Sequence, residues 1–275
     1  MRRQGAYAPA RIPTFAALVN ASTADRAVLL RPLGTSVRRA CRTYNMRGPD
    51  VHRIRAIATL APEDKAALID AYEGATVAVK RMLAAMIASL PQADVDLCPY
   101  CSLNQNPDLD HFLPKDKFSE FSLHGRNLVP ICPQCNRKKK TSFKTQQGER
   151  LFLHATYEPT IDQPILEAAI DYAGSLPSVT YRLDDHGALP TGERAIALRH
   201  LQRLGLADRY SKRAHAHLSS LKRSMSGMSP GVKSRTLASK IDTAALGKPI
   251  NDWEAALYRA VDVNAAPMLT WLTAA

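Results

Sequence analysis

Two Cys-x-x-Cys pairs constrain this chain more than any other feature of its sequence. They are Cys98/Cys101 and Cys132/Cys135, and the loop between them carries polar residues on apolar stretches. Four thiolates at this spacing can close a tetrahedral zinc site of the structural type, in which no coordination position stays open. We therefore expect a small module near the middle of the chain that Zn²⁺ holds together.

Charge and composition limit the partners and the location. The chain has 275 residues, and 37 Lys and Arg against 25 Asp and Glu give a formal net charge of +12. This excess favours a polyanionic partner, because neutralised phosphates release counterions, but it does not choose between DNA, RNA and an acidic membrane. No apolar run approaches the roughly 20 residues of a membrane span. We expect a cytoplasmic protein that has no membrane segment, with the fifth cysteine, Cys41, as a small core residue.

Outside the module, the sequence reads mainly as helices. Apolar residues fall mostly three, four or seven apart between Pro62, at a first-turn position, and Leu90. Further helices and one strand are expected at residues 191–204, from about Ala207, at 251–271 and, for the strand, at 178–183.

These elements predict an α+β, mostly α protein in three parts. A helical, basic N-terminal region spans residues 1–95, the zinc-clasped module residues 96–150, and a mainly helical C-terminal region residues 151–275. An arginine series from Arg26 to Arg55 has few acids near it, so it is either a solvated face or a phosphate-binding one.

The module contains residue types that suit phosphodiester chemistry. Asp110 and His111 stand on a short strand-like stretch that ends at Pro114, and Asn127 opens a second such stretch. The second cysteine pair then leads through Asn136 into a basic helix. An imidazole can take a proton from water near neutral pH, and carboxylate and amide oxygens can bind a divalent cation.

This order of strand, loop, strand and helix resembles the ββα-metal fold of HNH nucleases. The motifs DH, N and CxxCN match that family at Asp110-His111, Asn127 and Cys132–Asn136, and the resemblance covers about fifty residues from Cys98. It implies that His111 is the general base, that Asp110 and Asn136 bind a divalent cation, and that Asn127 ties the hairpin together and orients His111.

Metal choice and substrate follow from the same resemblance. Many family members carry a second His where this chain has Lys140, whose ammonium group has no lone pair for a metal. Oxygen ligands from Asp110 and Asn136 favour Mg²⁺ or Mn²⁺ at the catalytic position, beside the structural Zn²⁺. The family chemistry is hydrolysis of DNA to a 5′-phosphate and a 3′-hydroxyl. A basic run is expected to contact phosphates: Arg137, Lys138, Lys139, Lys140 and Lys144.

The wider segment from LDHFLPK to NRKKK, followed by FLHATYE, is similar to stand-alone bacterial HNH proteins of phage-defence systems, including the Septu type. That likeness implies an ATPase subunit as a partner, with the flanking helices as docking surfaces, and it leaves a homo-oligomer open. Two alternatives also remain open: a zinc-stabilised nucleic-acid-binding adaptor without cleavage activity, and an RNA-cutting enzyme. His124 and His154 are expected to be a loop residue and a packing residue.

Overall fold

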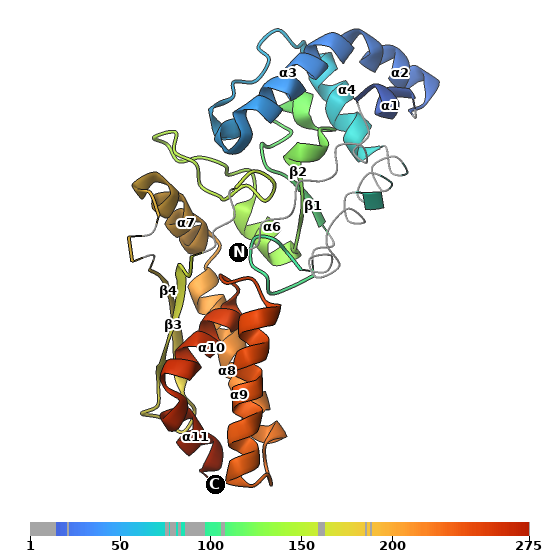
Figure 1. Cartoon of the computed structure of the whole chain (residues 1–275). Coiled ribbons are helices and arrows are strands. Elements are labelled where there is room, and N and C mark those ends of the chain that lie inside the picture. The colour runs from blue at the N-terminus through green and yellow to red at the C-terminus, as the bar shows by residue number, and fades with distance from the viewer. Residues whose placement is uncertain are drawn as a thin grey trace. The chain divides into compact units, whose positions relative to one another are not determined.

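The computed structural model describes residues 15–20, 22–74, 77, 81, 84–85, 97–105, 108–158, 163–184, 186–187 and 189–274. The chain divides into two compact units, Arg3–Pro159 and Thr160–Ala275. Helices dominate the described residues of both units, and each unit contains one two-stranded sheet (Figure 1). This confirms the predicted α+β, mostly α class. None of the described helices is both long enough and apolar enough to cross a membrane.

The first unit consists of short helices, 3₁₀ turns (η) and one hairpin. Its elements are α1 (Phe15–Asn20), α2 (Ala24–Leu30), η2 (Arg31–Leu33), α3 (Gly34–Arg47), η3 (Gly48–Arg53), α4 (Pro62–Glu73), β1 (Asp108–His111), η5 (Ser119–Phe121), η6 (Gly125–Asn127), β2 (Leu128–Ile131) and α6 (Pro133–Lys139).

Helix α4 begins at Pro62, where the sequence predicted a helix to start. Pro62 occupies its first turn, where the missing N–H costs nothing, and the Asp64 carboxylate accepts a hydrogen bond from Ala61 N at 3.3 Å. The helix is described as far as Glu73, and most of the remainder of the predicted helix, up to residue 90, lies outside the described residues.

The module has the predicted order of strand, loop, strand and helix. Strands β1 and β2 pair antiparallel, with Asp110 opposite Val129 and His111 opposite Leu128. Helix α6 follows directly, because Cys132 caps it through Sγ and Pro133 supplies the fixed φ of a first helical residue.

The N-terminal helices and the module share one apolar core. Leu30, Val37 and Leu68 of the helices belong to the same buried cluster as Leu123 and Leu128 of the module. Burial of such side chains stabilises each by about 1.5–3 kcal/mol relative to exposure. Helices α2, α3 and α4 are therefore part of the scaffold that holds the hairpin.

The second unit packs helices on the other hairpin. Its elements are β3 (Leu166–Asp171), β4 (Ser178–Leu183), α7 (Thr191–Arg203), α8 (Leu206–Ser224), α9 (Pro230–Gly247), α10 (Trp253–Val263) and α11 (Ala265–Thr273). Helix α10 packs on β3 and α8 on β4. Val179, Tyr181 and Leu183 alternate with exposed residues along β4, as the sequence predicted. The predicted helix at 251–271 is divided, since α10 ends at Val263 and the next residue, Asn264, has a non-helical backbone with φ −120° and ψ 40°.

Candidate active site

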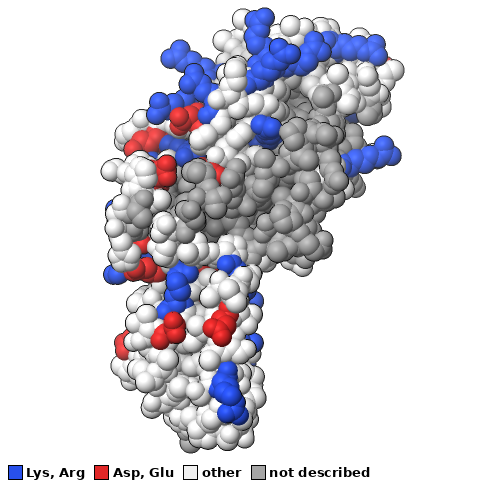
Figure 2. Space-filling view, in the orientation of Figure 1, with Lys and Arg blue, Asp and Glu red and all other residues white. Residues whose placement is uncertain are grey.

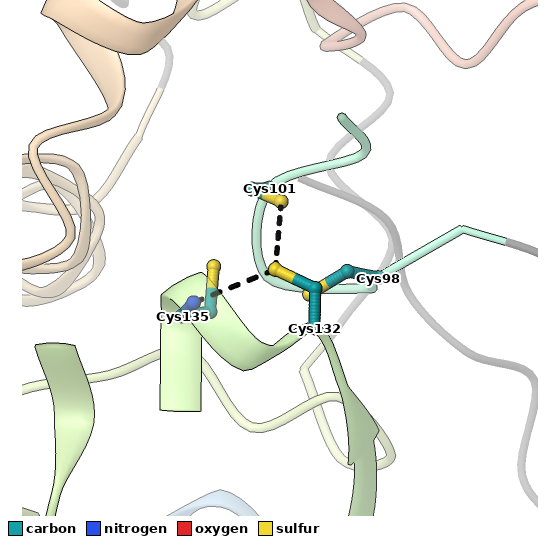
Figure 3. A group of neighbouring side chains, drawn as sticks. All are labelled: Cys98, Cys101, Cys132 and Cys135. Atoms are coloured by element: carbon teal, nitrogen blue, oxygen red, sulfur yellow. Dashed lines mark hydrogen bonds between the residues drawn. The ribbon is translucent and has the colours of Figure 1, made fainter. Parts of the chain in front are cut away.

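Four cysteines meet at one point of the first unit. Cys98 and Cys101 lie on a turn, whereas Cys132 and Cys135 lie at the start of α6 (Figure 3). Their sulfur atoms all lie within 4.8 Å of one another, and all four side chains are buried. The turn and the helix end thus bring the predicted zinc ligands together.

The geometry of this cluster suits a zinc ion. A tetrahedral site with Zn–S bonds of about 2.3 Å places neighbouring sulfur atoms about 3.8 Å apart. Sγ of Cys101 lies 3.8 Å from Sγ of Cys132, and Cys132 also accepts a hydrogen bond from the backbone N–H of Cys135. The cysteine cluster therefore has the donor type, number and spacing of a closed zinc site. Cys41 is not part of the cluster.

Three oxygen-bearing side chains gather where β1 faces α6. Asp108 and Asp110 share one face of β1, because side chains alternate along a strand. Asn136 Nδ2 donates to Asp108 Oδ2 at 3.2 Å, and Asp110 Oδ2 lies 2.9 Å from Nζ of Lys139, both partners being on α6. Asp108 was not among the predicted site residues, although it lies beside two of them, Asp110 and Asn136. The alternation in Asp108-Leu109-Asp110 was the signal that could have shown it.

Lys139 lies inside the module instead of on its basic surface. Its side chain is fully buried, it forms an ion pair with Asp110, and Nζ donates to the backbone oxygen of His111 at 2.9 Å. Lys139 and the buried Cys135 are four residues apart, so they share the inner face of α6. The predicted phosphate contact of Lys139 does not agree with this position, whereas Arg137, Lys138 and Lys140 are exposed, as is Lys144 beyond the helix.

The Asp110 carboxylate has an unusual environment. Only 10% of its side chain is exposed, and Lys139 approaches Oδ2 as an ion pair without the alignment of a hydrogen bond. Burial raises the pKa of Asp110 above its usual value, and the ammonium group of Lys139 opposes that change. A buried carboxylate oxygen without a well-aligned donor is a position that a divalent cation could take.

His111 points to the other face of β1. Its ring lies edge-on to Tyr72 of α4, with 4.4 Å between the centroids, and its Nε2 lies 2.9 Å from the backbone oxygen of Ser122. A carbonyl oxygen can only accept, so Nε2 carries the hydrogen and Nδ1 is the basic nitrogen. Within the described residues, Nδ1 has no hydrogen-bond partner. Burial lowers the pKa of His111 to about 4, which keeps the ring neutral at pH 7.

Asn127 is the last residue of the loop between the two strands, and its side chain bonds back across that loop. Its Oδ1 accepts from Leu113 N at 2.8 Å, and its Nδ2 donates to the backbone oxygens of Leu113 at 3.0 Å and Phe121 at 3.3 Å. Tyr44 of α3 also donates to Oδ1, at 3.1 Å. The fully buried amide thereby ties Leu113 to Phe121, the residue that precedes Ser122.

A second group of possible metal ligands lies in the other unit. Glu167, Asp184 and His186 place ligand atoms within 4.8 Å of one another. Arg182 forms ion pairs with both carboxylates, at 2.9 Å to Glu167 and 3.3 Å to Asp184. Arg182 therefore offsets part of the acidic charge, and the group is a surface ion-pair cluster.

Comparisons with known proteins agree with this geometry. Residues 98–142 match the family model described as HNH endonuclease. The chain is 30% identical over 129 residues to Protein ea31 of Escherichia phage lambda, which covers 44% of this chain and 42% of that protein. It is 32% identical over 72 residues to the Septu protein PtuB of Bacillus thuringiensis, which covers 24% of this chain and 25% of that protein.

The matched stretches span less than half the length of either relative. No solved structure matches the chain. The family match and the cysteine cluster confirm an HNH endonuclease domain with a zinc-clasp arrangement, and the likeness to a Septu protein that the motifs predicted is also confirmed.

Proposed function

We propose that this chain is a metal-dependent endonuclease that hydrolyses phosphodiester bonds of DNA and leaves a 5′-phosphate and a 3′-hydroxyl. One observation carries the proposal: inside an HNH domain, the backbone oxygen of Ser122 holds Nε2–H of His111, and no described residue bonds Nδ1. A neutral imidazole with one fixed and one available nitrogen is the arrangement that a general base needs.

In the proposed reaction, Nδ1 of His111 takes a proton from the attacking water. The carbonyl oxygen of Ser122 keeps the ring oriented and stabilises the imidazolium that forms, since the hydrogen bond to Nε2–H strengthens when the ring becomes charged. His111 therefore acts in one defined tautomer.

Asp110 and Asn136 are the proposed ligands of a Mg²⁺ or Mn²⁺ ion, with Asp108 as a neighbouring oxygen donor. When bound, the ion offsets the negative charge that develops on the leaving 3′ oxygen. Lys139 has a separate role in this proposal: its buried ammonium group holds the Asp110 carboxylate at the face of α6.

Exposed basic residues of α6 and the segment after it are the proposed contacts to the DNA backbone: Arg137, Lys138, Lys140 and Lys144. Figure 2 shows further Lys and Arg side chains gathered over the N-terminal helices, and Arg38, Arg39 and Arg42 of α3 are among the exposed ones. Backbone contacts of this kind position a duplex without reading its sequence.

We further propose a role in phage defence beside an ATPase subunit, in the cytoplasm. This proposal is supported by the likeness to the Septu protein PtuB and by the resemblance of the motifs to those of such defence proteins. In this proposal the chain has an N-terminal region (1–95), a nuclease module (96–150) and a C-terminal region (151–275) that docks the partner. Self-association is the other proposed arrangement. Co-purification with the ATPase encoded beside it tests this role, and a chain that binds no such subunit contradicts it.

A second candidate function is a nucleic-acid-binding adaptor that does not cut. The burial of His111 against Tyr72 favours the adaptor. His111 is only 7% exposed, so a substrate has little access to its Nδ1. Plasmid DNA and a structured RNA incubated with the protein and Mn²⁺, Mg²⁺ or EDTA separate the two functions. Metal-dependent nicking of DNA supports the nuclease, and salt-sensitive binding without cleavage supports the adaptor. Cleavage of the RNA but not of the DNA would show that the enzyme cuts RNA.

A further inference from the structure

We propose that Tyr44 and His154, which both lie outside the HNH match at residues 98–142, are positioning residues of the nuclease site. Together they fix the amide of Asn127, and through it the loop whose backbone holds His111. This inference rests on the proposed nuclease function for its effect on rate, but the positioning itself can be measured without any cleavage.

The two side chains meet Asn127 in the interior of the first unit. Tyr44, His154 and Asn127 are each 0% exposed. The Tyr44 hydroxyl lies 3.1 Å from Asn127 Oδ1 and 3.0 Å from His154 Nε2. Residues separated by 83 and 110 positions in the sequence thus share one hydroxyl group.

The donor and the acceptor can be assigned in the hydrogen bonds that link His154, Tyr44 and Asn127. Backbone N–H of Thr156 donates to His154 Nδ1 at 3.2 Å, so that nitrogen is the acceptor. Burial lowers the pKa of His154 well below its usual value, so the ring is neutral and its single hydrogen is on Nε2. Nε2–H then donates to Tyr44 Oη, and the Tyr44 hydroxyl donates its own hydrogen to Asn127 Oδ1.

This relay completes the bonding of Asn127. With Tyr44 and Leu113 N donating to Oδ1, and Nδ2 donating to the oxygens of Leu113 and Phe121, all four hydrogen-bonding positions of the amide are filled. The residue after Phe121 is Ser122, whose carbonyl oxygen accepts from His111 Nε2. A shift of Asn127 would therefore move the carbonyl group that selects the tautomer of His111.

Packing alone does not require the Tyr44 hydroxyl. The ring already packs against Phe121, with 5.0 Å between centroids, and against His124 at 4.9 Å, and a Phe ring would keep both contacts. A buried hydroxyl costs desolvation free energy unless it is hydrogen-bonded. A buried hydroxyl that bonds both the Asn127 amide and the His154 ring is therefore explained by positioning.

The test compares Tyr44→Phe with a matched control, Tyr181→Phe, which also loses a buried hydroxyl bond, to Trp253 O, but in the other unit. For Tyr44→Phe we expect kcat for DNA cleavage to fall by about 10- to 100-fold, with KM and zinc content unchanged, as for other supporting hydrogen bonds around a site. Tyr181→Phe should keep the wild-type kcat. His154→Leu should lower kcat like Tyr44→Phe, and the double variant no further, because the two residues act as one unit.

A second readout does not depend on cleavage. NMR of the ¹⁵N-labelled protein at one fixed pH reports the tautomer of His111: the wild type should show a single Nε2–H form, and Tyr44→Phe a mixture of both forms. An unchanged His111 signal in Tyr44→Phe, or a fall in kcat only in proportion to lost zinc or lost folded protein, overturns the positioning role. If the wild type does not cut DNA, the nuclease proposal fails. The NMR comparison still tests whether Tyr44 and His154 position Asn127.

Discussion

Asp110 and His111 are neighbours in the sequence, yet their side chains lie on different sides of one strand. Alternation along β1 directs Asp110 toward α6, where Lys139 meets it, and His111 toward Tyr72 of α4. Each side chain consequently has its own environment, with a buried ion pair on one side and an aromatic edge on the other. This separation gives the carboxyl group of Asp110 and the imidazole of His111 different electrostatic surroundings, which shift their pKa values independently.

The rate of cleavage should depend on pH through His111. A general base must be neutral, and a histidine is neutral above its pKa, which burial lowers from the usual 6.5 to about 4 here. The cleavage rate should therefore stay on its plateau as the pH falls from about 7.5 to about 5.5, and decline only nearer pH 4. Single-turnover rates, with zinc content measured at each pH, check this. An acid limb centred near 6.5 with zinc retained would show that His111 is not buried in the active state.

Lys139 should matter for stability although it is one of four consecutive basic residues. Its charge is buried against Asp110, whose side chain is 10% exposed, so removing it leaves a buried carboxylate without a partner. We expect Lys139→Met to lower the free energy of unfolding by about 3–5 kcal/mol. The neighbouring Lys138 is exposed, and Lys138→Met should change the free energy of unfolding by less than about 0.5 kcal/mol. Urea denaturation measures both, and equal values for the two variants are incompatible with the buried ion pair.

At the scale of elements, the four-cysteine cluster joins a hairpin and a helix that are too small to be stable alone. Strands β1 and β2 have four residues each and α6 has seven, so they bury little apolar surface by themselves. A structural zinc site contributes about 10–16 kcal/mol of apparent binding free energy to folding. The clasp, together with the core shared with α2–α4, therefore holds the hairpin in place.

Replacing one clasp ligand should release the metal and unfold the module. Cys135→Ser is expected to purify without zinc and to lose the hydrogen-exchange protection of β1 and β2. Cys41→Ser is the control, since Cys41 lies outside the cluster and should leave zinc content at one ion per chain. Metal analysis of both purified proteins gives the answer. Full zinc content in Cys135→Ser contradicts the four-cysteine site.

The outer face of α6 should bind DNA through charge alone. Arg137 and Lys138 are exposed, so alanine at either position should weaken binding of all DNA sequences alike and reduce the slope of log K against log salt by about one. Lys212, exposed on α8, is a control of equal charge. Fluorescence anisotropy across a salt series measures the slopes, and a slope that stays at the wild-type value removes these residues from the interface.

Much of the module could be predicted from the sequence because its signals are local. The cysteine spacing, the first strand and the start of α6 all depend on neighbouring residues, and they appear as expected, except that β1 ends at His111 instead of continuing to Pro114. The inward orientation of the Lys139 side chain could have been predicted from its spacing of four residues to Cys135. The bonds from Tyr44 and His154 to Asn127 could not, because nothing local indicates that α3 packs onto the loop.

For the whole molecule, the two compact units differ in what they offer. The first contains the HNH match, the cysteine cluster and the exposed arginines of α3. The second has a hairpin covered by helices and a surface cluster in which Arg182 forms ion pairs with Glu167 and Asp184. The matched stretches cover less than half of each relative, and the second unit is the proposed docking part.

The most direct test of the account is the single-turnover cleavage rate of a DNA duplex with Mn²⁺, compared between the wild type, His111→Ala and His186→Ala. His186 is an exposed histidine of the second unit and controls for loss of an imidazole. The account predicts that His111→Ala lowers the rate by about 100- to 10,000-fold at unchanged zinc content, that His186→Ala keeps the wild-type rate, and that EDTA abolishes cleavage. Cleavage by zinc-loaded His111→Ala at the wild-type rate would contradict it.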